Sequence, residues 1–176
     1  MVRTHTHSVC QTIFPEGRNV HGALFGGYIM HEGFDIAHFA AKYFMGGDPI
    51  AIGLDEAVFV QPVAVGDMLK FTARVVHVAC RVVRVNVVVE VLHPDAFGPG
   101  RVADALNTNF DGRVVGKRSN RMMFLFLHSK KGETTDGCLP QVVPDSYKEI
   151  LMHVDALRRQ KEEGPTEEFI SHHYGI

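Results

Sequence analysis

Apolar residues dominate the segment from residue 28 to residue 45, and its few polar positions recur at a helical spacing. They fall at i, i+4, i+7 and i+11, in a single stripe along one helix: His31, Asp35, His38 and Lys42. The stripe is either a solvated or interface face with local ion pairs, or a set that places its first three members near a reacting group. Glycine and proline at residues 46–49 predict the end of the helix. Because so apolar a helix must be covered, we predict that a sheet wraps around it.

The sequence after this helix changes to the period of two that is typical of strands. Residues 68–79 and 81–92 alternate between apolar and polar side chains, which predicts antiparallel strands with one face on the core. Residues 50–60 and 121–128 are apolar on both faces and predict two more strands, the second of them central. A short first strand is predicted at residues 9–14, before a Pro-Glu-Gly turn.

The C-terminal part of the chain predicts a second helix. Asp145 or Ser146 can cap its start, Glu149 lies in its first turn, and Gly164-Pro165 ends it at about residue 163. The fold class is therefore α+β. We expect the main domain at residues 1–143 and an added helix and tail at 144–176.

Composition is typical of one soluble globular domain, with 176 residues, 45% hydrophobic and 22% charged. A net charge of −2 argues against nucleic acid as the main partner. No apolar run approaches the length that spans a bilayer.

Cysteine and histidine positions are expected to carry no metal. The cysteines are widely spaced and odd in number, which predicts reduced thiols in an intracellular compartment: Cys10, Cys80 and Cys138. Without a Cys-x-x-Cys pair, a structural zinc site is not expected. His5-x-His7 and His172-His173 fall near the two ends of the chain, where flexible surface residues are the default.

Gly26 and Gly27 stand at the start of the long helix, where backbone N–H groups lack intrahelical partners and the helix dipole is positive. Two residues without Cβ atoms let a substrate carbonyl approach those donors, as an oxyanion site requires. The alternative interpretation is that the glycines only allow close packing of the helix against a strand.

These residues resemble the hotdog-fold acyl-CoA thioesterases. Two motifs carry the resemblance: Asn19-x-x-Gly22-x-x-Phe25-Gly26-Gly27-x-Ile29-Met30 and Asp55-x-x-x-Phe59-x-x-Pro62-Val63-x-Val65-Gly66-Asp67. The resemblance covers residues 19–92 and is closest to the second hotdog domain of the mitochondrial double-hotdog acyl-CoA thioesterases. It implies a hotdog fold, in which an antiparallel sheet wraps a long central helix, with an added C-terminal helix here.

The resemblance also implies an activity, the hydrolysis of acyl-CoA to free fatty acid and coenzyme A, with no cofactor beyond the coenzyme A of the substrate. In that family the helix N-terminal amides hold the thioester carbonyl, a loop Asn holds substrate or water, and an acid activates the water. The implied catalytic residues here are Asn19, Gly26 and Gly27. The expected substrate-binding residues, the last four of them for the phosphates of coenzyme A, are His21, Phe25, Asp55, Phe59, Arg81, Arg84, Lys117 and Arg118.

The catalytic acid is where the chain departs from the family pattern. Single-domain relatives carry an Asp seven residues after the second glycine, but here that position is Phe34. Asp35 follows it, turned by about 80° relative to Gly27. Asp35, His31 or His38 serves as the base in a self-paired chain, or the base comes from another hotdog domain.

The expected partners are therefore the acyl-CoA substrate and either further copies of the chain or a second hotdog domain. The competing hypothesis is a non-catalytic acyl-CoA-binding or structural hotdog half that needs an Asp-bearing partner. The resemblance implies a mitochondrial location, although no Arg-rich leader precedes Cys10.

Overall fold

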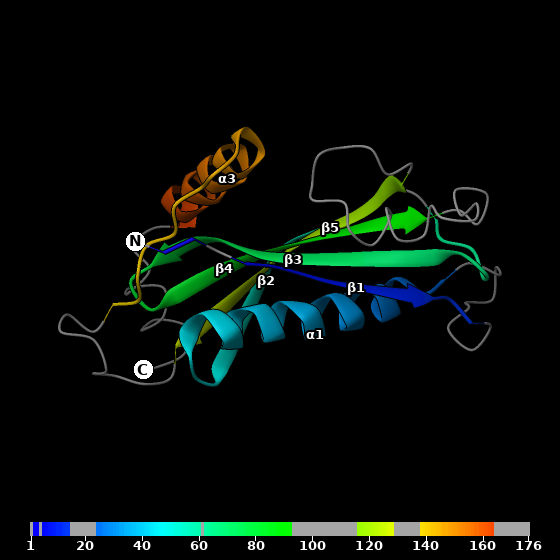
Figure 1. The fold of residues 1–176 in the computed structure, drawn as a ribbon, viewed down its shortest axis with the longest axis horizontal. Coiled ribbons are helices and arrows are strands. Elements are labelled where there is room, and N and C mark those ends of the chain that lie inside the picture. Colours follow the sequence, from blue (N-terminus) through cyan, green and yellow to red (C-terminus); the bar gives the residue numbers. More distant parts are fainter. Residues whose placement is uncertain are drawn as a thin grey trace.

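A computed structural model describes residues 2–3, 5–14, 24–60, 62–92, 116–128 and 138–163, with the backbone alone for 116–119 and 163. Its elements, in chain order, are β1 (Thr6–Thr12), α1 (Gly26–Met45), β2 (Pro49–Phe59), β3 (Met68–Ala79), β4 (Val82–Leu92), β5 (Gly116–His128) and α3 (Tyr147–Glu163). The predicted α+β class is confirmed. Figure 1 shows α1 against one face of the sheet and α3 over the other.

The sheet has five strands in the order β1-β3-β4-β5-β2, and every neighbouring pair is antiparallel. β4 and β5 therefore lie inside the sheet, as the apolar pattern of residues 121–128 predicts. β2 is also largely apolar on both faces, but it lies at an edge. β1 forms the other edge and begins at residue 6, three residues before the predicted start.

The buried side of α1 is made of small residues, which lets the helix axis lie close to the sheet. Ala37, Ala40 and Ala41 are at most 1% exposed. Gly33 allows the same close approach, because a Cβ there would overlap the terminal methyl of Met122 on β5 and that side chain would have to shift. Valine and phenylalanine side chains from β3, β4 and β5 fill the other half of this core. Burial of that apolar surface, at about 25 cal/mol per Å², is the main force holding α1 in place.

The predicted end of α1 is confirmed in detail. Gly46 adopts a left-handed conformation, with φ 68°, and its amide donates to the carbonyl of Lys42 at 3.0 Å. The Lys42 ammonium then pairs with Asp48 at 2.6 Å.

The expectation that β3 and β4 present one face to solvent is wrong. Their second face is also buried, including its polar side chains: Lys70, Thr72, His77, Arg84 and Asn86. α3 covers part of that face, where Ala156 packs against Val76 and Met123. Polar alternation along a strand therefore marks a second, polar packing layer here and not a solvated surface.

The expectation of three reduced cysteines is also wrong. Cys80, in the turn between β3 and β4, forms a disulfide with Cys138, which precedes α3 by nine residues. The Leu139 amide donates to the Cys80 carbonyl at 2.8 Å beside it. Cys10 keeps a free thiol, and burial raises its pKa. An intracellular location can therefore not be argued from free thiols.

Several predicted features lie outside the described residues. They are the Pro-Glu-Gly turn, the loop with Asn19 and His21, and the tail after residue 163. Within the described ranges, no helix is long and apolar enough to cross a membrane.

Candidate functional site

The start of α1 is anchored by the turn that joins β2 to β3. The Leu24 amide donates to the Val63 carbonyl at 2.8 Å, just before the helix begins. The end of β1 is tied to the same turn, because the Gly66 amide donates to the Ile13 carbonyl and the Ile13 amide donates to Asp67, both at 2.9 Å. Gly66 has a φ of 94°, which favours glycine. Val63, in the second sequence motif, thus fixes the backbone just before the helix of the first motif begins.

Within the described residues, the first turn of α1 has backbone donors for which no acceptor is found. Phe25 is the N-cap residue in an extended conformation, with no side-chain cap, and the turn contains no acid. The Tyr28 amide bonds back to the Phe25 carbonyl at 3.0 Å. Among the described residues, nothing accepts from the amides of Gly26 and Gly27. These two N–H groups and the positive end of the helix dipole are the components of an anion-binding or oxyanion-binding site.

Two aromatic rings flank these glycines. A Cβ at Gly27 would overlap the ring of Phe25, and a Cβ at Gly26 would lie 3.4 Å from the ring of Phe59 at the end of β2. Phe25 is 62% exposed and Phe59 is 47% exposed. Both interpretations of the glycine pair therefore have support, since glycine admits the rings and also leaves the amides approachable. The structure thus brings Gly26, Gly27, Phe25 and Phe59 together, and their roles in binding and catalysis stay predictions.

Tyr28 is a polar group at this site that the sequence analysis does not single out. Its hydroxyl accepts a hydrogen bond from the side-chain amide of Gln11 on β1. Burial and the nearby Glu32 carboxylate raise the pKa of Tyr28 above its usual value. Its position directly after the two glycines was a signal, but the contact with Gln11 depends on how β1 lies against α1.

Phe34, at the position of the family's acid, lies in an aromatic cluster. Its ring centroid is 5.8 Å from that of Phe124, 5.9 Å from that of Phe126 and 6.0 Å from that of His38. Asp35 lies beside this cluster on the outer side of the helix, with its side chain 61% exposed and 3.7 Å from Nδ1 of His31. His31 and Asp35 thus belong to the solvated part of the polar stripe, whereas His38 packs against Phe126. The role of Asp35 as base stays a prediction.

Asp55 lies on the other face of the sheet from the glycines. Its carboxylate pairs with the guanidinium of Arg84 at 2.8 Å and with that of Arg159 on α3 at 3.5 Å. A bulge in β2 between residues 54 and 56 explains this placement, because it brings Asp55 and Glu56 to the same side. The predicted contact of Asp55 with substrate stays a prediction.

The four basic residues expected near coenzyme A do not come together. Arg84 is 3% exposed and pairs with Asp55, and Arg81 donates to the His128 carbonyl at 2.9 Å. Lys117 and Arg118 lie on β5 opposite residues 91 and 90 of β4. Six residues of strand separate positions 84 and 90, a distance of roughly 20 Å.

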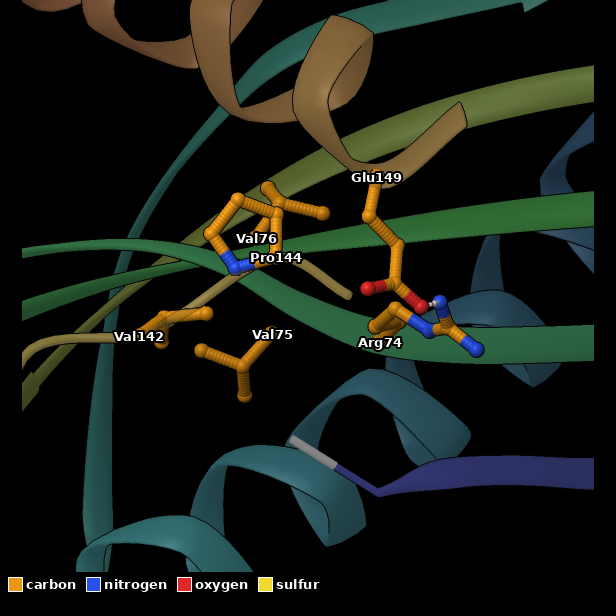
Figure 2. A pocket seen from close by; sticks show the side chains of 6 residues that line it. All are labelled: Arg74, Val75, Val76, Val142, Pro144 and Glu149. Atoms are coloured by element: carbon orange, nitrogen blue, oxygen red, sulfur yellow. Dashed lines mark hydrogen bonds and ion pairs between the residues drawn. The ribbon is translucent and has the colours of Figure 1, made fainter. Parts of the chain in front are cut away.

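Two cavities lie away from the glycines. One of about 140 Å³ is bounded by His5, His7 and Tyr43, beside the C-terminal half of α1. Another, of about 10 Å³, lies between β3 and the segment before α3 and holds no more than one water (Figure 2). In the described ranges, no three His, Cys, Asp or Glu side chains are grouped so that they could hold a metal ion.

Comparison with known structures identifies the fold. The chain superimposes on a variant of an acyl-CoA hydrolase from Staphylococcus aureus with a TM-score of 0.72 and 19% identity, covering 90% of this chain and 86% of that one. An acyl-CoA hydrolase from Bacillus cereus superimposes with a TM-score of 0.71 and 19% identity, covering 95% of this chain and 90% of that one. The chain therefore has the hotdog fold.

Curated sequences show the same relationship, although no family model matches. Acyl-coenzyme A thioesterase 2, chloroplastic, from Humulus lupulus is 32% identical over 98 residues, which is 53% of this chain and 22% of that protein. Acyl-coenzyme A thioesterase 10, mitochondrial, from Mus musculus is 26% identical over 147 residues, which is 84% of this chain and 28% of that protein. The chain is thus similar in sequence to acyl-coenzyme A thioesterases, and it spans about a quarter of the length of these curated proteins.

Proposed function

We propose that this chain acts as a hotdog unit of an acyl-CoA thioesterase, which hydrolyses acyl-CoA to a free fatty acid and coenzyme A. The observation that carries the proposal is the uncapped start of α1, where the amides of Gly26 and Gly27 have no acceptor among the described residues. The names of the sequence relatives support the same chemistry.

In the proposed reaction the thioester carbonyl oxygen accepts hydrogen bonds from these two amides. Water attacks the carbonyl carbon while a carboxylate takes its proton, and negative charge develops on the oxygen. Collapse of this intermediate breaks the C–S bond, and the coenzyme A sulfur leaves and takes up a proton. One positioned donor to such an oxygen is worth about 3–4 kcal/mol. Asn19 is proposed to hold the water or the carbonyl, and the chemistry calls for no metal or redox cofactor.

We propose that the carboxylate comes from a neighbouring hotdog. Phe34 supplies no acid and is held by Phe124 and Phe126, while Asp35 is solvated beside His31. A base on a second helix that faces this one would complete the site without any movement of α1.

The exposed edge of the sheet supports such pairing. β2 is an edge strand, and its apolar side chains remain exposed, at 45% for Ile50, 38% for Leu54 and 40% for Val58. A long edge strand with exposed apolar side chains is a template for another strand. We propose that β2 pairs with β2 of a second copy or with a second hotdog domain. A monomeric mass by light scattering would contradict the pairing.

The test of the function is an acyl-CoA hydrolysis panel, with released coenzyme A as the readout. We expect Asn19→Ala to lower kcat/KM by about tenfold or more. Gly27→Ala should do the same, because its methyl group displaces the Phe25 ring into the approach to the amides. The matched control is Gly47→Ala, whose added Cβ meets His128 at an ordinary 3.6 Å. Unchanged kcat/KM in both site variants would remove the start of α1 from the mechanism.

A second candidate function is a non-catalytic acyl-CoA-binding half. The Phe34 cluster favours it, because the position of the family's acid is filled by a packed aromatic ring. Purified chain that binds coenzyme A by calorimetry but turns over no thioester, and gains activity only with an Asp-bearing partner domain, would decide for this alternative.

We further propose a mitochondrial location, on the strength of relatives named as mitochondrial proteins. Fractionation of cells that express the tagged full-length gene product is the direct test, and a signal outside the organelle would reject the proposal.

A further inference from the structure

Asn120 of β5 is a buried polar side chain that has no hydrogen-bond partner among the described residues. It is 1% exposed, and both its Nδ2 and its Oδ1 are unpaired. The other buried side chains with an unpaired atom each bond through a second atom. His77 pairs with Gln160 of α3 at 2.6 Å, and Arg81 donates to the His128 carbonyl at 2.9 Å. Of these described side chains, Asn120 alone leaves all of its hydrogen-bonding capacity unused.

The register of the sheet places Asn120 on the face that α1 covers. It lies opposite Phe59 of β2 on one side and opposite Val89 of β4 on the other. Directly opposite residues of antiparallel strands point to the same side of the sheet, with Cβ atoms about 5 Å apart. Val89 belongs to the core beneath α1, and the ring of Phe59 lies 3.4 Å from where a Cβ of Gly26 would stand. Asn120 therefore also points toward α1, beside Phe59.

Contacts along β5 place Asn120 beneath the first turns of the helix. The ring of Phe126 packs against His38, at 5.9 Å between centroids, and Met122 fills the space beside Gly33. Lower residue numbers on β5 thus face lower residue numbers on α1. Asn120 is two residues before Met122, about 7 Å along the strand. It therefore lies below the helical residues that precede Gly33, in the part of α1 that begins with the glycine pair.

The neighbours of Asn120 on this face give no reason for an amide. Phe59, Val89 and Met122 flank it along and across the strands, and all three are apolar. A buried amide without partners lowers stability, because its hydrogen bonds to water are lost and not replaced. Valine would pack among these neighbours without that cost. Since buried polar groups in folded proteins are nearly always paired, the amide is suited to a group from outside the chain.

We propose that Asn120 is a further catalytic residue of the thioesterase site, which holds the thioester carbonyl and the attacking water together. This inference rests on the proposed function, and it adds a contact from the sheet to the amides of Gly26 and Gly27. An asparagine side chain carries a donor and an acceptor side by side. Nδ2 donates to the carbonyl oxygen, and Oδ1 accepts from the water. The two reacting groups are about 3 Å apart before attack, which suits this pair of atoms.

Asn120 takes no proton in this step. The water proton passes to the carboxylate and the C–S bond breaks, while the amide keeps both of its hydrogens. The hydrogen bond from Nδ2 strengthens as negative charge develops on the oxygen. Access to Asn120 passes the ring of Phe59, which is 47% exposed at the end of β2. The substrate reaches the amide when this ring turns toward solvent.

The test compares two buried asparagines on opposite faces of the sheet. Asn120→Val is expected to lower kcat for acyl-CoA hydrolysis by about 100-fold, as loss of one positioned donor does. KM should change much less, because the contact strengthens in the transition state. The matched control is Asn86→Val, which should keep the wild-type kcat. Asn86 is 2% exposed on the α3 face and donates to the Met152 sulfur at 3.7 Å.

Stability gives a second readout on the same variant. The unfolding midpoint of Asn120→Val should equal or exceed that of the wild type, because an unpaired buried amide is removed and valine suits a strand. A clearly lower midpoint would show that the amide has partners within the folded chain, and would overturn the proposal.

Asn120→Thr separates hydrogen bonding from shape, because threonine and valine have the same shape and differ by one hydroxyl. Activity should fall in the order wild type, Asn120→Thr, Asn120→Val. The pH profile of kcat should keep its shape in both variants, since an amide does not titrate. The proposal is overturned if Asn120→Val is as active as Asn120→Thr or as the wild type.

A binding measurement separates this inference from the proposed function. Acetonyl-coenzyme A keeps a carbonyl near the sulfur but cannot be hydrolysed, and propyl-coenzyme A is the same ligand without the carbonyl oxygen. By calorimetry, Asn120→Val should weaken binding of the first ligand several-fold and leave the second unchanged. Equal effects on both ligands would overturn the contact with the carbonyl.

The two failures are distinguishable. Wild-type chain that turns over no acyl-CoA would count against the proposed function, and the paired ligands would then decide whether Asn120 meets a carbonyl. Hydrolysis that is lost in Gly27→Ala but kept in Asn120→Val would reject this inference alone.

Discussion

The two helices of this chain are attached to opposite faces of one sheet by different forces. α1 is attached by apolar burial, through small residues such as Ala37 and Ala41 that let it approach the strands. α3 is attached by a cluster of ion pairs in which Arg159 contacts Asp55, Glu56 and Asp155. From this difference we expect α1 to unfold with the core, and α3 to be a more separable element whose docking depends on pH and salt.

The largest expected effect concerns the α1 face. Phe126 is fully buried on β5 and packs against Phe34 and His38. We expect Phe126→Ala to lower the free energy of unfolding by about 3–5 kcal/mol, through lost burial and the cavity that remains. Urea denaturation should give that loss equally at low and at high salt. A loss that shrinks strongly in salt would contradict the assignment of this face to apolar packing.

A smaller effect is expected on the α3 face. Burial disfavours the charge of Asp155, but Arg159, Arg158 and Arg121 outweigh it and lower the pKa of Asp155 below its usual value. Arg159→Met should release α3, with a loss of about 1–3 kcal/mol that decreases as salt rises. Hydrogen exchange of residues 147–163 should speed up while α1 stays protected. Equal deprotection of both helices would show that they form one cooperative unit.

The smallest effect is a pH dependence of α3 docking. His77 is 5% exposed, and burial lowers its pKa; Gln160 opposes the shift, while His153 and Arg84 add to it. Because the folded pKa lies below the unfolded one, the unfolded chain takes up the proton first. The contribution of His77 to stability should be full above about pH 6.5 and be lost progressively as the pH drops below that value.

The same measurement needs a correction for His7, whose pKa is also lowered, by burial and then by His5. The His77→Gln variant is therefore compared with the protein that keeps His77, both in a His7→Asn background. The acid-side loss of stability should be present where His77 is kept and absent in the His77→Gln variant. An identical pH profile in the two proteins would remove His77 from the docking of α3.

Much of the fold could be predicted because its signals are local. The ends of α1, β3 and β4 follow from glycine, proline and alternation within a few residues. The placement of Asp55 could not be predicted, because a bulge in β2 changes the face that each following side chain occupies. The Cys80–Cys138 pairing and the polar underside of α3 are long-range features, with partners more than 50 residues away in sequence.

The site could be predicted in part, for a similar reason. Gly26, Gly27 and Phe25 are neighbours in sequence, and Phe59 joins them through the β2–β3 turn that the second motif forms. The separation of Lys117 and Arg118 from Arg81 and Arg84 depends on the register between β4 and β5, which no single segment encodes.

The Cys80–Cys138 bond has a consequence for bench work. A reagent that reacts with sulfhydryl groups finds only Cys10 when the bond is closed, but all three cysteines when it is opened. Colorimetric detection of liberated coenzyme A relies on the same reaction. Oxidised and reduced batches of this protein will therefore show different blanks, and each needs its own baseline before any turnover is counted.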